Sequence, residues 1–213
     1  MLLTISPSQF RAVTFDDLIG PAAAVGRVLA AKIARLKAHP GTATAKHIIY
    51  GPPGTGKSEL AGIVALGLAD HALAIERISG LKVNVDLVKR WLDTLGTGCL
   101  FGDWQVKVVH EMDRIPRDAQ DLLLDYLDQL PPKTGFIGTS NMQLDLLQER
   151  FQTRMQPWKI LGPTDTEIAA FITARWDVDA KTASLIAVGC GGNVRAALLD
   201  AESHLDVQLS LAA

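Results

Sequence analysis

The fold of this chain is decided by the stretch Gly51-Pro52-Pro53-Gly54-Thr55-Gly56-Lys57-Ser58. It matches the phosphate-loop pattern G-x-x-x-x-G-K-S/T at every position. Glycines let the backbone wrap so that its N–H groups point at phosphate oxygens, and the following helix presents its positive end to them. In such a loop Lys57 would reach the β- and γ-phosphates, and the Ser58 hydroxyl would bind Mg²⁺. The alternative is an ordinary Gly/Pro turn before a lysine, which a match over the whole loop disfavours.

The segments around this loop alternate between strand-like and helix-like patterns. Short apolar runs predict strands at residues 47–50, 75–78, 106–109 and 135–139. Apolar residues three and four apart predict helices at residues 22–38, 57–69, 85–95 and 118–130. This alternation predicts an α/β fold, an αβα sandwich with a parallel sheet covered on both faces.

Beyond Pro163 the pattern becomes purely helical. Three helical stretches, at residues 166–176, 180–188 and 193–205, follow one another with no strand-like run between them. We therefore expect a nucleotide-binding domain over residues 1–162 and a small all-helical domain over residues 163–213.

Composition narrows the classes of function. The chain has 213 residues, 48% hydrophobic and 21% charged, with a net charge of −2, as in globular proteins rather than disordered ones. It shows neither a run of apolar residues long enough to span a membrane nor a secretory signal. Cys99 and Cys190 stand alone, which excludes a zinc ribbon and leaves the cytoplasm as the expected location. The near-neutral charge means that any nucleic-acid contact must be local.

With its motifs in this order, the sequence resembles the AAA+ ATPases, particularly their clamp-loader branch, with the Holliday-junction branch-migration motors as close neighbours. The resemblance covers nearly the whole chain and implies ATP and Mg²⁺ as cofactors and a helical lid after the sandwich. Residues 14–20 resemble the family's N-terminal segment, which lies over the adenine base. The nucleotide-binding residues that it implies are Ile19, Gly20, Gly51, Pro52, Pro53, Gly54, Thr55, Gly56, Lys57, Ser58, Glu59, Asn141 and Arg195.

Two polar residues resemble the family's nucleotide sensors. Asn141 ends a stretch similar to the sensor 1 strand, where a fixed hydrogen-bond donor orients the attacking water. Arg195 opens the last helix after Gly192 and resembles sensor 2, which would couple the position of the lid to the γ-phosphate. A plain turn and a plain helix start are the alternatives, and the order of the motifs favours the sensors.

Residues 147–154 resemble the segment that carries the family's arginine finger. Counting back from Pro163 places Arg154 at the finger, whereas Arg150 fits a Glu-Arg-Phe variant of the same loop. Such a guanidinium would complete the site of a neighbouring subunit by binding the γ-phosphate. The resemblance thus implies self-association, or assembly with related AAA+ subunits, with Arg154 acting in trans. Which arginine is the finger stays open, because either could make a surface ion pair instead.

The sequence departs from the family where its third strand should end in Asp-Glu. Glu111 matches the catalytic glutamate that polarises water, but His110 stands in place of the aspartate. Mg²⁺ is a hard cation that prefers oxygen, so a neutral imidazole serves it poorly. The candidate metal ligands are therefore Ser58, His110 and Glu111, and we expect normal ATP binding with reduced turnover.

Two functions remain in view at this point. The first is an ATPase motor or switch of clamp-loader type that acts in DNA replication, repair or mobilisation. Its DNA contacts would come from five basic residues, Lys82, Lys89, Arg90, Arg114 and Arg117. For these residues the alternative is that they simply form a charged face exposed to solvent. The alternative is a weakly hydrolysing nucleotide-binding scaffold that recognises a protein partner. Only 18 residues follow Arg195, so we expect no collar domain of the kind that holds clamp loaders together.

Overall fold

A five-stranded sheet forms the centre of the computed structural model, which describes residues 5–41, 43–98, 100–141 and 149–212. Cys99 and the first two residues of the predicted finger segment, Leu147 and Gln148, lie outside the described residues. The strands are β1 (Thr44–Tyr50), β2 (Ile75–Ser79), β3 (Gln105–His110), β4 (Thr134–Ser140) and β5 (Gln156–Lys159). All neighbours pair in parallel in the order β2-β3-β4-β1-β5. The expected parallel α/β sheet is confirmed.

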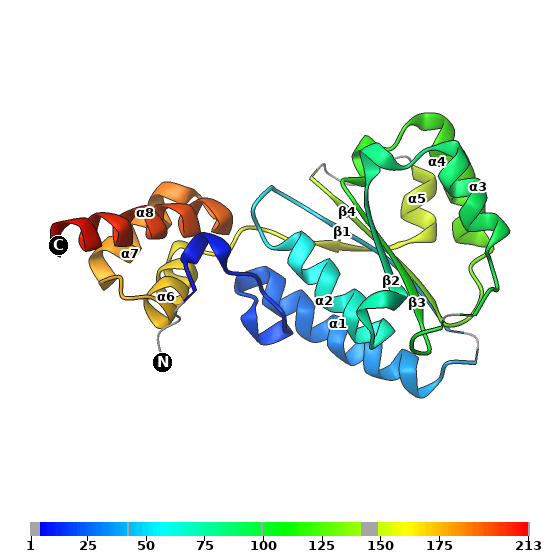
Figure 1. The fold of residues 1–213 in the computed structure, drawn as a ribbon, viewed down its shortest axis with the longest axis horizontal. Coiled ribbons are helices and arrows are strands. Elements are labelled where there is room, and N and C mark those ends of the chain that lie inside the picture. Colours follow the sequence, from blue (N-terminus) through cyan, green and yellow to red (C-terminus); the bar gives the residue numbers. More distant parts are fainter. Residues whose placement is uncertain (1–4, 42, 99, 142–148, 213) are drawn as a thin grey trace.

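Helices cover both faces of the sheet (Figure 1). Successive residues of β1 point to opposite faces, so its apolar run feeds two separate cores. Ile49 packs with the core beneath α1 (Gly20–Ala38) and α2 (Lys57–Ala69). Ile48 packs with the core beneath the three helices of the other layer. These are α3 (Val85–Asp93), α4 (Arg117–Asp128) and α5 (Glu149–Arg154).

The fifth strand was not predicted from the sequence. It covers only four residues, most of them exposed, and contains Pro157, which cannot donate a backbone hydrogen bond. It nevertheless pairs with β1 as an edge strand, with Ile48 opposite Pro157. The short helix α5 that leads into it was also not predicted.

The carboxyl ends of the three central strands meet at one edge of the sheet. The phosphate loop follows β1, His110 ends β3 and Ser140 ends β4. Gly51 donates a backbone hydrogen bond to the Ser140 carbonyl at 3.3 Å, which joins the loop to the neighbouring strand. In parallel sheets this edge is where ligands bind.

Three helices after the sheet form a core of their own, α6 (Asp165–Arg175), α7 (Ala180–Cys190) and α8 (Val194–Ala212). The start of the chain packs against this core, as Figure 1 shows. Phe10 lies edge-on to Phe171 at 5.5 Å and to Trp176 at 5.7 Å between ring centroids. Trp176 also donates its indole N–H to the Ile5 carbonyl at 2.8 Å. We keep the division at residues 162 and 163 as a proposal, with the N-terminal segment crossing it.

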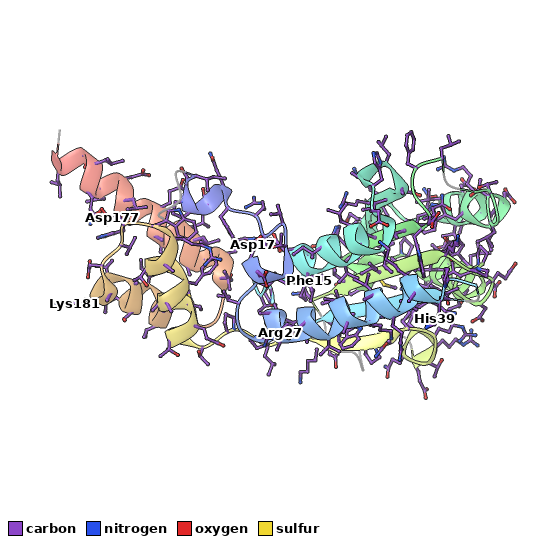
Figure 2. The ribbon with its side chains drawn as sticks, turned by 90° about the horizontal axis from the view of Figure 1, so that it is seen from below. Phe15, Asp17, Arg27, His39, Asp177 and Lys181 are labelled. Atoms are coloured by element: carbon purple, nitrogen blue, oxygen red, sulfur yellow. The ribbon has the colours of Figure 1, made fainter. Side chains whose placement is uncertain are left out.

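The remaining connections contain short 3₁₀ helices. They are η1 (Pro7–Gln9), η2 (Phe15–Asp17), η3 (Ala72–Ala74), η4 (Gly80–Lys82) and η5 (Met112–Arg114). Figure 2 places Phe15 and Asp17 of η2 at the junction between the sheet and the C-terminal helices. Among the described residues, none of the helices has both the length and the apolar character needed to cross a bilayer.

Candidate nucleotide-binding site

A pocket of about 370 Å³ lies where the phosphate loop, the N-terminal segment and the C-terminal helices meet. The predicted site residues that line it are Ile19, Pro53, Gly54, Thr55, Gly56, Lys57, Ser58, Glu59, Glu111, Asn141 and Arg195. The predicted site residues outside its lining are Gly20, Gly51, Pro52, His110, Arg150 and Arg154. The pocket therefore joins motifs that are up to 176 positions apart, from Ile19 to Arg195.

Two glycines of the loop adopt a backbone conformation that strains other residues. Gly54 and Gly56 adopt φ values of +74° and +86°, a left-handed conformation that L side chains rarely take. A Cβ on Gly54 would also lie 1.8 Å from Oδ1 of Asn193, at the start of α8. The Val194 N–H donates to the Gly54 carbonyl at 2.9 Å, so the loop is bonded directly to the start of α8.

Two of the predicted residues that do not line the pocket support the loop from behind. A Cβ on Gly51 would lie 1.9 Å from the Ile160 carbonyl oxygen, so a glycine is needed for the loop to pass β5. Pro52 turns its carbonyl inward, where it accepts hydrogen bonds from the Thr55 hydroxyl at 2.9 Å and from Nζ of Lys57 at 2.5 Å.

Two cations of the predicted site, Lys57 and Arg195, line the pocket. Lys57 is only 5% exposed, and burial together with the nearby charge of Arg195 lowers its pKa, against the opposing effects of Asp113 and Glu59. Within the described part of the chain, Arg195 makes no hydrogen bond or ion pair. Two cations that destabilise each other in one pocket are suited to an anion that neutralises both. Together with the glycine loop, they fit the phosphates of a nucleotide.

Several apolar side chains line the pocket, and most of them were missed from the sequence. It is lined by Phe10 and Leu18 from the N-terminal segment and by Phe171 and Leu198 from the helical domain. Asp17 and Leu18 belong to the segment 14–20 that was expected at the adenine base, and the missed lining residues are Ser8, Phe10, Arg11, Ala12, Ala22, Thr139, Phe171, Val194, Leu198 and Leu199. Leu198 and Leu199 could have been found, because they lie three and four positions after Arg195 and share its helix face.

Glu111 and Asn141 meet at the sheet edge of the pocket. The Glu111 backbone, with φ +55°, donates its N–H to Oγ1 of Thr139 at 3.3 Å. Its carboxylate lies 3.4 Å from Nη1 of Arg114. The Asn141 backbone N–H donates to Oδ1 of Asp113 at 3.3 Å. Two adjacent strand ends thus bring a carboxylate and an amide to one side of the pocket.

His110 stands apart from the other two candidate metal ligands. Ser58 and Glu111 line the pocket, whereas the half-buried His110 ring lies with Nδ1 3.5 Å from Oγ1 of Thr139. Burial, followed by the charge of Arg77, lowers the His110 pKa and so favours the neutral ring. In the described ranges, groups of three or more His, Cys, Asp or Glu placed to hold a metal are absent. A metal here would need the oxygens of a bound nucleotide.

Both candidate finger arginines lie on α5 and are paired within their own chain. Arg154 donates from Nε to both carboxylate oxygens of Asp128 at 2.9 Å, with Nη2 at 2.8 Å. Arg150 makes a looser pair with Asp121 at 3.8 Å, where both side chains are about 70% exposed. Neither arginine lines the pocket of its own chain.

Known proteins share this architecture. The structure of the Thermotoga maritima RuvB Holliday junction branch migration motor matches with a TM-score of 0.76 and 21% identity, covering 95% of this chain and 67% of that one. A lysine-to-arginine mutant of RuvB matches with a TM-score of 0.76 and 19% identity, covering 95% and 68%. The chain has the AAA+ fold. These identities establish the fold alone, and RuvB is what the chain resembles.

The match found by sequence covers a shorter part of the chain than the structural matches do. An uncharacterized AAA domain-containing protein of Mycobacterium tuberculosis is 30% identical over 88 residues, which is 41% of this chain. The matched segment spans about a fifth, 19%, of that curated relative. No family model matches the sequence.

Proposed function

We propose that this chain binds Mg·ATP in the pocket, hydrolyses it, and uses the bound nucleotide to set the position of its helical domain. The observation that carries the proposal is the joining of the phosphate loop to α8, through the Val194–Gly54 hydrogen bond, with Lys57 and Arg195 facing one pocket. A ligand held by both cations would contact both domains at once. The occupancy of the pocket would then change the free energy of every arrangement of the two domains.

Each residue of the site takes a distinct part in this proposal. The loop N–H groups, Lys57 and Arg195 would hold the phosphates, and Ser58 would hold the metal. Mg²⁺, when bound, neutralises charge that develops on the phosphate oxygens. Glu111 would accept a proton from the attacking water, and Asn141 would orient that water.

The contacts between the two domains support a switching role. Gly162, just before the proposed boundary, packs so closely on Gly192 that a Cβ on Gly162 would lie 2.9 Å from the Gly192 carbonyl oxygen. At the start of α1, a Cβ on Gly20 would lie 2.6 Å from the Cβ and 3.0 Å from the Cα of Pro163. Such close backbone packing has few intermediate arrangements, so a small shift at the phosphates would reposition the whole helical domain.

We infer further that the chain assembles head to tail with copies of itself or with related AAA+ subunits. Neither Arg150 nor Arg154 reaches its own pocket, as a group acting in trans requires. Arg154 would have to leave Asp128 to reach a neighbour, whereas the looser pair of Arg150 would open more readily. Head-to-tail contacts are heterologous and build rings or helical filaments.

A DNA-related process is the broader role that we propose, since the similar RuvB structure is that of a branch migration motor. Exposed basic residues, Lys82 on η4 and Arg114 on η5, lie beside the carboxyl edge of the sheet. Arg117 begins α4 close by. Whether the chain works as a clamp loader or as a branch migration motor would follow from which DNA it engages.

The scaffold function has one observation in its favour. Burial lowers the pKa of His110 and so favours its neutral form, and the half-buried ring lies outside the pocket lining, so the end of β3 gives the metal no carboxylate. A chain that binds ATP and hydrolyses it slowly could hold a protein partner in a nucleotide-dependent shape.

Steady-state hydrolysis of Mg·ATP by the purified chain separates the two functions. For a motor we expect turnover that Lys57→Ala and Glu111→Gln both abolish, with ATP binding kept in Glu111→Gln and lost in Lys57→Ala. Lys181→Ala, an exposed lysine of the helical domain, is the matched control and should leave both unchanged. ATP binding without turnover would favour the scaffold, and absence of ATP binding would refute both functions.

A further inference from the structure

A second pocket, of about 200 Å³, lies at the edge of the sheet opposite the proposed ATP site. Gln105, which begins β3, and Thr134, which begins β4, line this amino-edge pocket. The rest of its lining comes mainly from α3, α4 and the segments that follow them. Glu111, just after the end of β3, lines the proposed ATP pocket instead. The two pockets therefore lie at opposite ends of one strand and share no lining residue.

The amino-edge pocket contains a hydroxyl without a partner. Tyr126 is 3% exposed and lines the pocket, yet among the described residues its hydroxyl makes no hydrogen bond. No side-chain N or O atom in the described part of the chain is both fully buried and unpaired. The Tyr126 hydroxyl must therefore reach an opening, and the amino-edge pocket is the opening that Tyr126 lines. Burial, followed by the charge of Glu76, raises the pKa of Tyr126, so the hydroxyl keeps its proton and can donate.

Lys107 brings a second donor to the same pocket. Its side chain is 9% exposed, and its Nζ lies 4.8 Å from the centre of the Trp91 ring. The Lys107 Nζ donates to Oε2 of Glu76 at 2.6 Å, and Glu76 itself does not line the pocket. Within the described ranges, this carboxylate is the one oxygen acceptor that Lys107 has. An ammonium carries more N–H donors than one ion pair uses, so Lys107 has donors to spare.

The lining of the pocket indicates the class of ligand that would complete it. Tyr126 and Lys107 both offer donors, so the ligand must bring acceptors, and an ionised carboxylate is an acceptor-only group that also gains from the charge of the lysine. Trp91 and Pro131 give the pocket apolar, flat walls. Pockets for drug-sized ligands measure roughly 300–1,000 Å³, so this smaller pocket suits a smaller molecule.

We propose that the amino-edge pocket binds a small aromatic carboxylic acid, whose carboxylate accepts hydrogen bonds from the Tyr126 hydroxyl and the Lys107 ammonium while its ring packs against Trp91. The other charged residues of the lining, Asp103 and Lys133, pair with each other at 3.9 Å, so they leave this acceptor role to the ligand. The proposal does not depend on the ATP site, because no residue of that site takes part in it.

Benzoate and cinnamate are the probes, since they carry the same carboxylate on a smaller and a larger planar group. Calorimetry should show that at least one of them binds the purified chain, and that its uncharged amide binds at least about tenfold more weakly. Tyr126→Phe keeps the ring in the core and removes only the hydroxyl, so the affinity for the acid should fall about tenfold. Tyr50→Phe is the matched control, because the other tyrosine of the chain lines neither pocket, and it should bind as the wild type does.

The place of binding can be read from the tryptophan indole N–H signals in an NMR spectrum. The acid should shift the signal of Trp91, which lines the amino-edge pocket. It should leave the signal of Trp176 in place, because that ring packs on Phe10 at the proposed ATP pocket. Saturating ATP and the Lys57→Ala variant should both leave the affinity for the acid unchanged.

Several results would overturn the inference. They are the absence of binding by both acids, amides that bind as tightly as the acids, and a Tyr126→Phe variant with the affinity of the wild type. A shift of Trp176 without one of Trp91, abolished by ATP, would place the acid in the ATP pocket and overturn it as well. If Tyr126→Phe does not fold, the comparison of acid with amide and the Trp91 signal still decide, since both use the wild type.

Discussion

His110 is the residue at which this chain departs most sharply from the sequences that it resembles. An aspartate at this position would add a negative charge at the end of β3, beside Thr139 and Glu111. We predict that His110→Asp raises the steady-state rate of ATP hydrolysis several-fold, because a carboxylate supplies the oxygen donor that an imidazole lacks. Phosphate release in a coupled assay measures this effect. A rate that is unchanged or lower would show that the histidine does not limit turnover.

The two arginines of α5 can be distinguished by mixing variant subunits. If Arg154 acts in trans, Arg154→Ala abolishes hydrolysis, and mixing it with Lys57→Ala subunits restores activity, since those subunits still carry the arginine. Arg150→Ala, alone and mixed with Lys57→Ala, is the comparison. It should keep most of the hydrolysis, so mixing should restore little. If the two variants exchange these results, Arg150 is the finger. If neither variant loses activity, the trans mechanism fails.

Single residues also show what the sequence alone could predict. The phosphate loop, Glu111, Asn141 and Arg195 were assigned from short motifs, and the structure brings residues 53–58 of the loop into one pocket with the other three. Phe10 belongs to no such motif, because its role comes from packing on Phe171, far away in the sequence.

At the scale of the element, the phosphate loop depends on one glycine that serves two purposes. Gly54 needs a positive φ and must also leave room for Asn193 of the helical domain. We predict that Gly54→Ala lowers the free energy of unfolding by about 1–2 kcal/mol through backbone strain alone, and abolishes ATP binding. Chemical denaturation and calorimetry measure the two effects.

The matched control for this change lies only eight residues away. Gly62 is inside α2, and a Cβ there would have no atom within 4 Å. Gly62→Ala should therefore stabilise the protein, by about 0.5–1 kcal/mol, and leave ATP binding intact. Equal effects of the two substitutions would contradict the role given to the loop.

The pair of strands β1 and β5 makes a prediction about pH. His47 on β1 is 2% exposed and accepts the indole N–H of Trp158 on β5 at 3.2 Å. Burial, and then the charge of Lys32, lowers the His47 pKa to about 4. The unfolded chain binds a proton at this histidine below about pH 6.5 whereas the folded chain does not. The contribution of the neutral His47 to stability is therefore fully present above the pKa of this histidine in the unfolded chain. It is lost as the pH decreases toward 4.

Urea unfolding at two pH values tests this coupling. Between pH 7 and about pH 5, the titration of His47 should lower the free energy of unfolding of the wild type by roughly 2 kcal/mol. In His47→Gln the side-chain oxygen can still accept from Trp158 but cannot titrate, so its loss over the same range should be smaller by that amount. Equal losses in the two proteins would show that His47 does not titrate as described.

Elements differ in how well the sequence predicted them. Helix α2 begins and ends where it was expected, because its apolar pattern directly follows the loop motif. Strand β5 was missed, since a proline in a mostly exposed run gives no strand pattern, and only pairing with β1 makes it a strand. Local patterns predict elements that are buried, and they fail where an element depends on a distant partner.

At the scale of the whole molecule, the start and the end of the chain are packed together. Residues 5–10 contact the helical domain, with Phe10 and Trp176 in edge contact. A division of the chain at one point was the natural expectation from the change of pattern at Pro163. The structure adds an N-terminal segment that lines the pocket together with the phosphate loop and the C-terminal helices.

We predict that the chain assembles when nucleotide is bound. A non-hydrolysable ATP analogue should convert the chain into larger closed or helical assemblies, since an arginine acting in trans requires a neighbour at the pocket. Sedimentation velocity with and without the analogue measures the change, and Lys57→Ala should remain in its nucleotide-free form. A wild type that stays monomeric with the analogue bound would contradict the trans mechanism.

The most direct test of the account is the affinity of the wild type for Mg·ATP beside two variants from opposite sides of the pocket. Lys57→Ala removes the cation of the phosphate loop, and Arg195→Ala removes the cation of the helical domain. We predict that the wild type binds Mg·ATP and that each variant loses at least about tenfold in affinity by calorimetry. A wild type that binds no ATP, or an Arg195→Ala variant that binds as tightly as the wild type, would contradict a nucleotide site shared by the two domains.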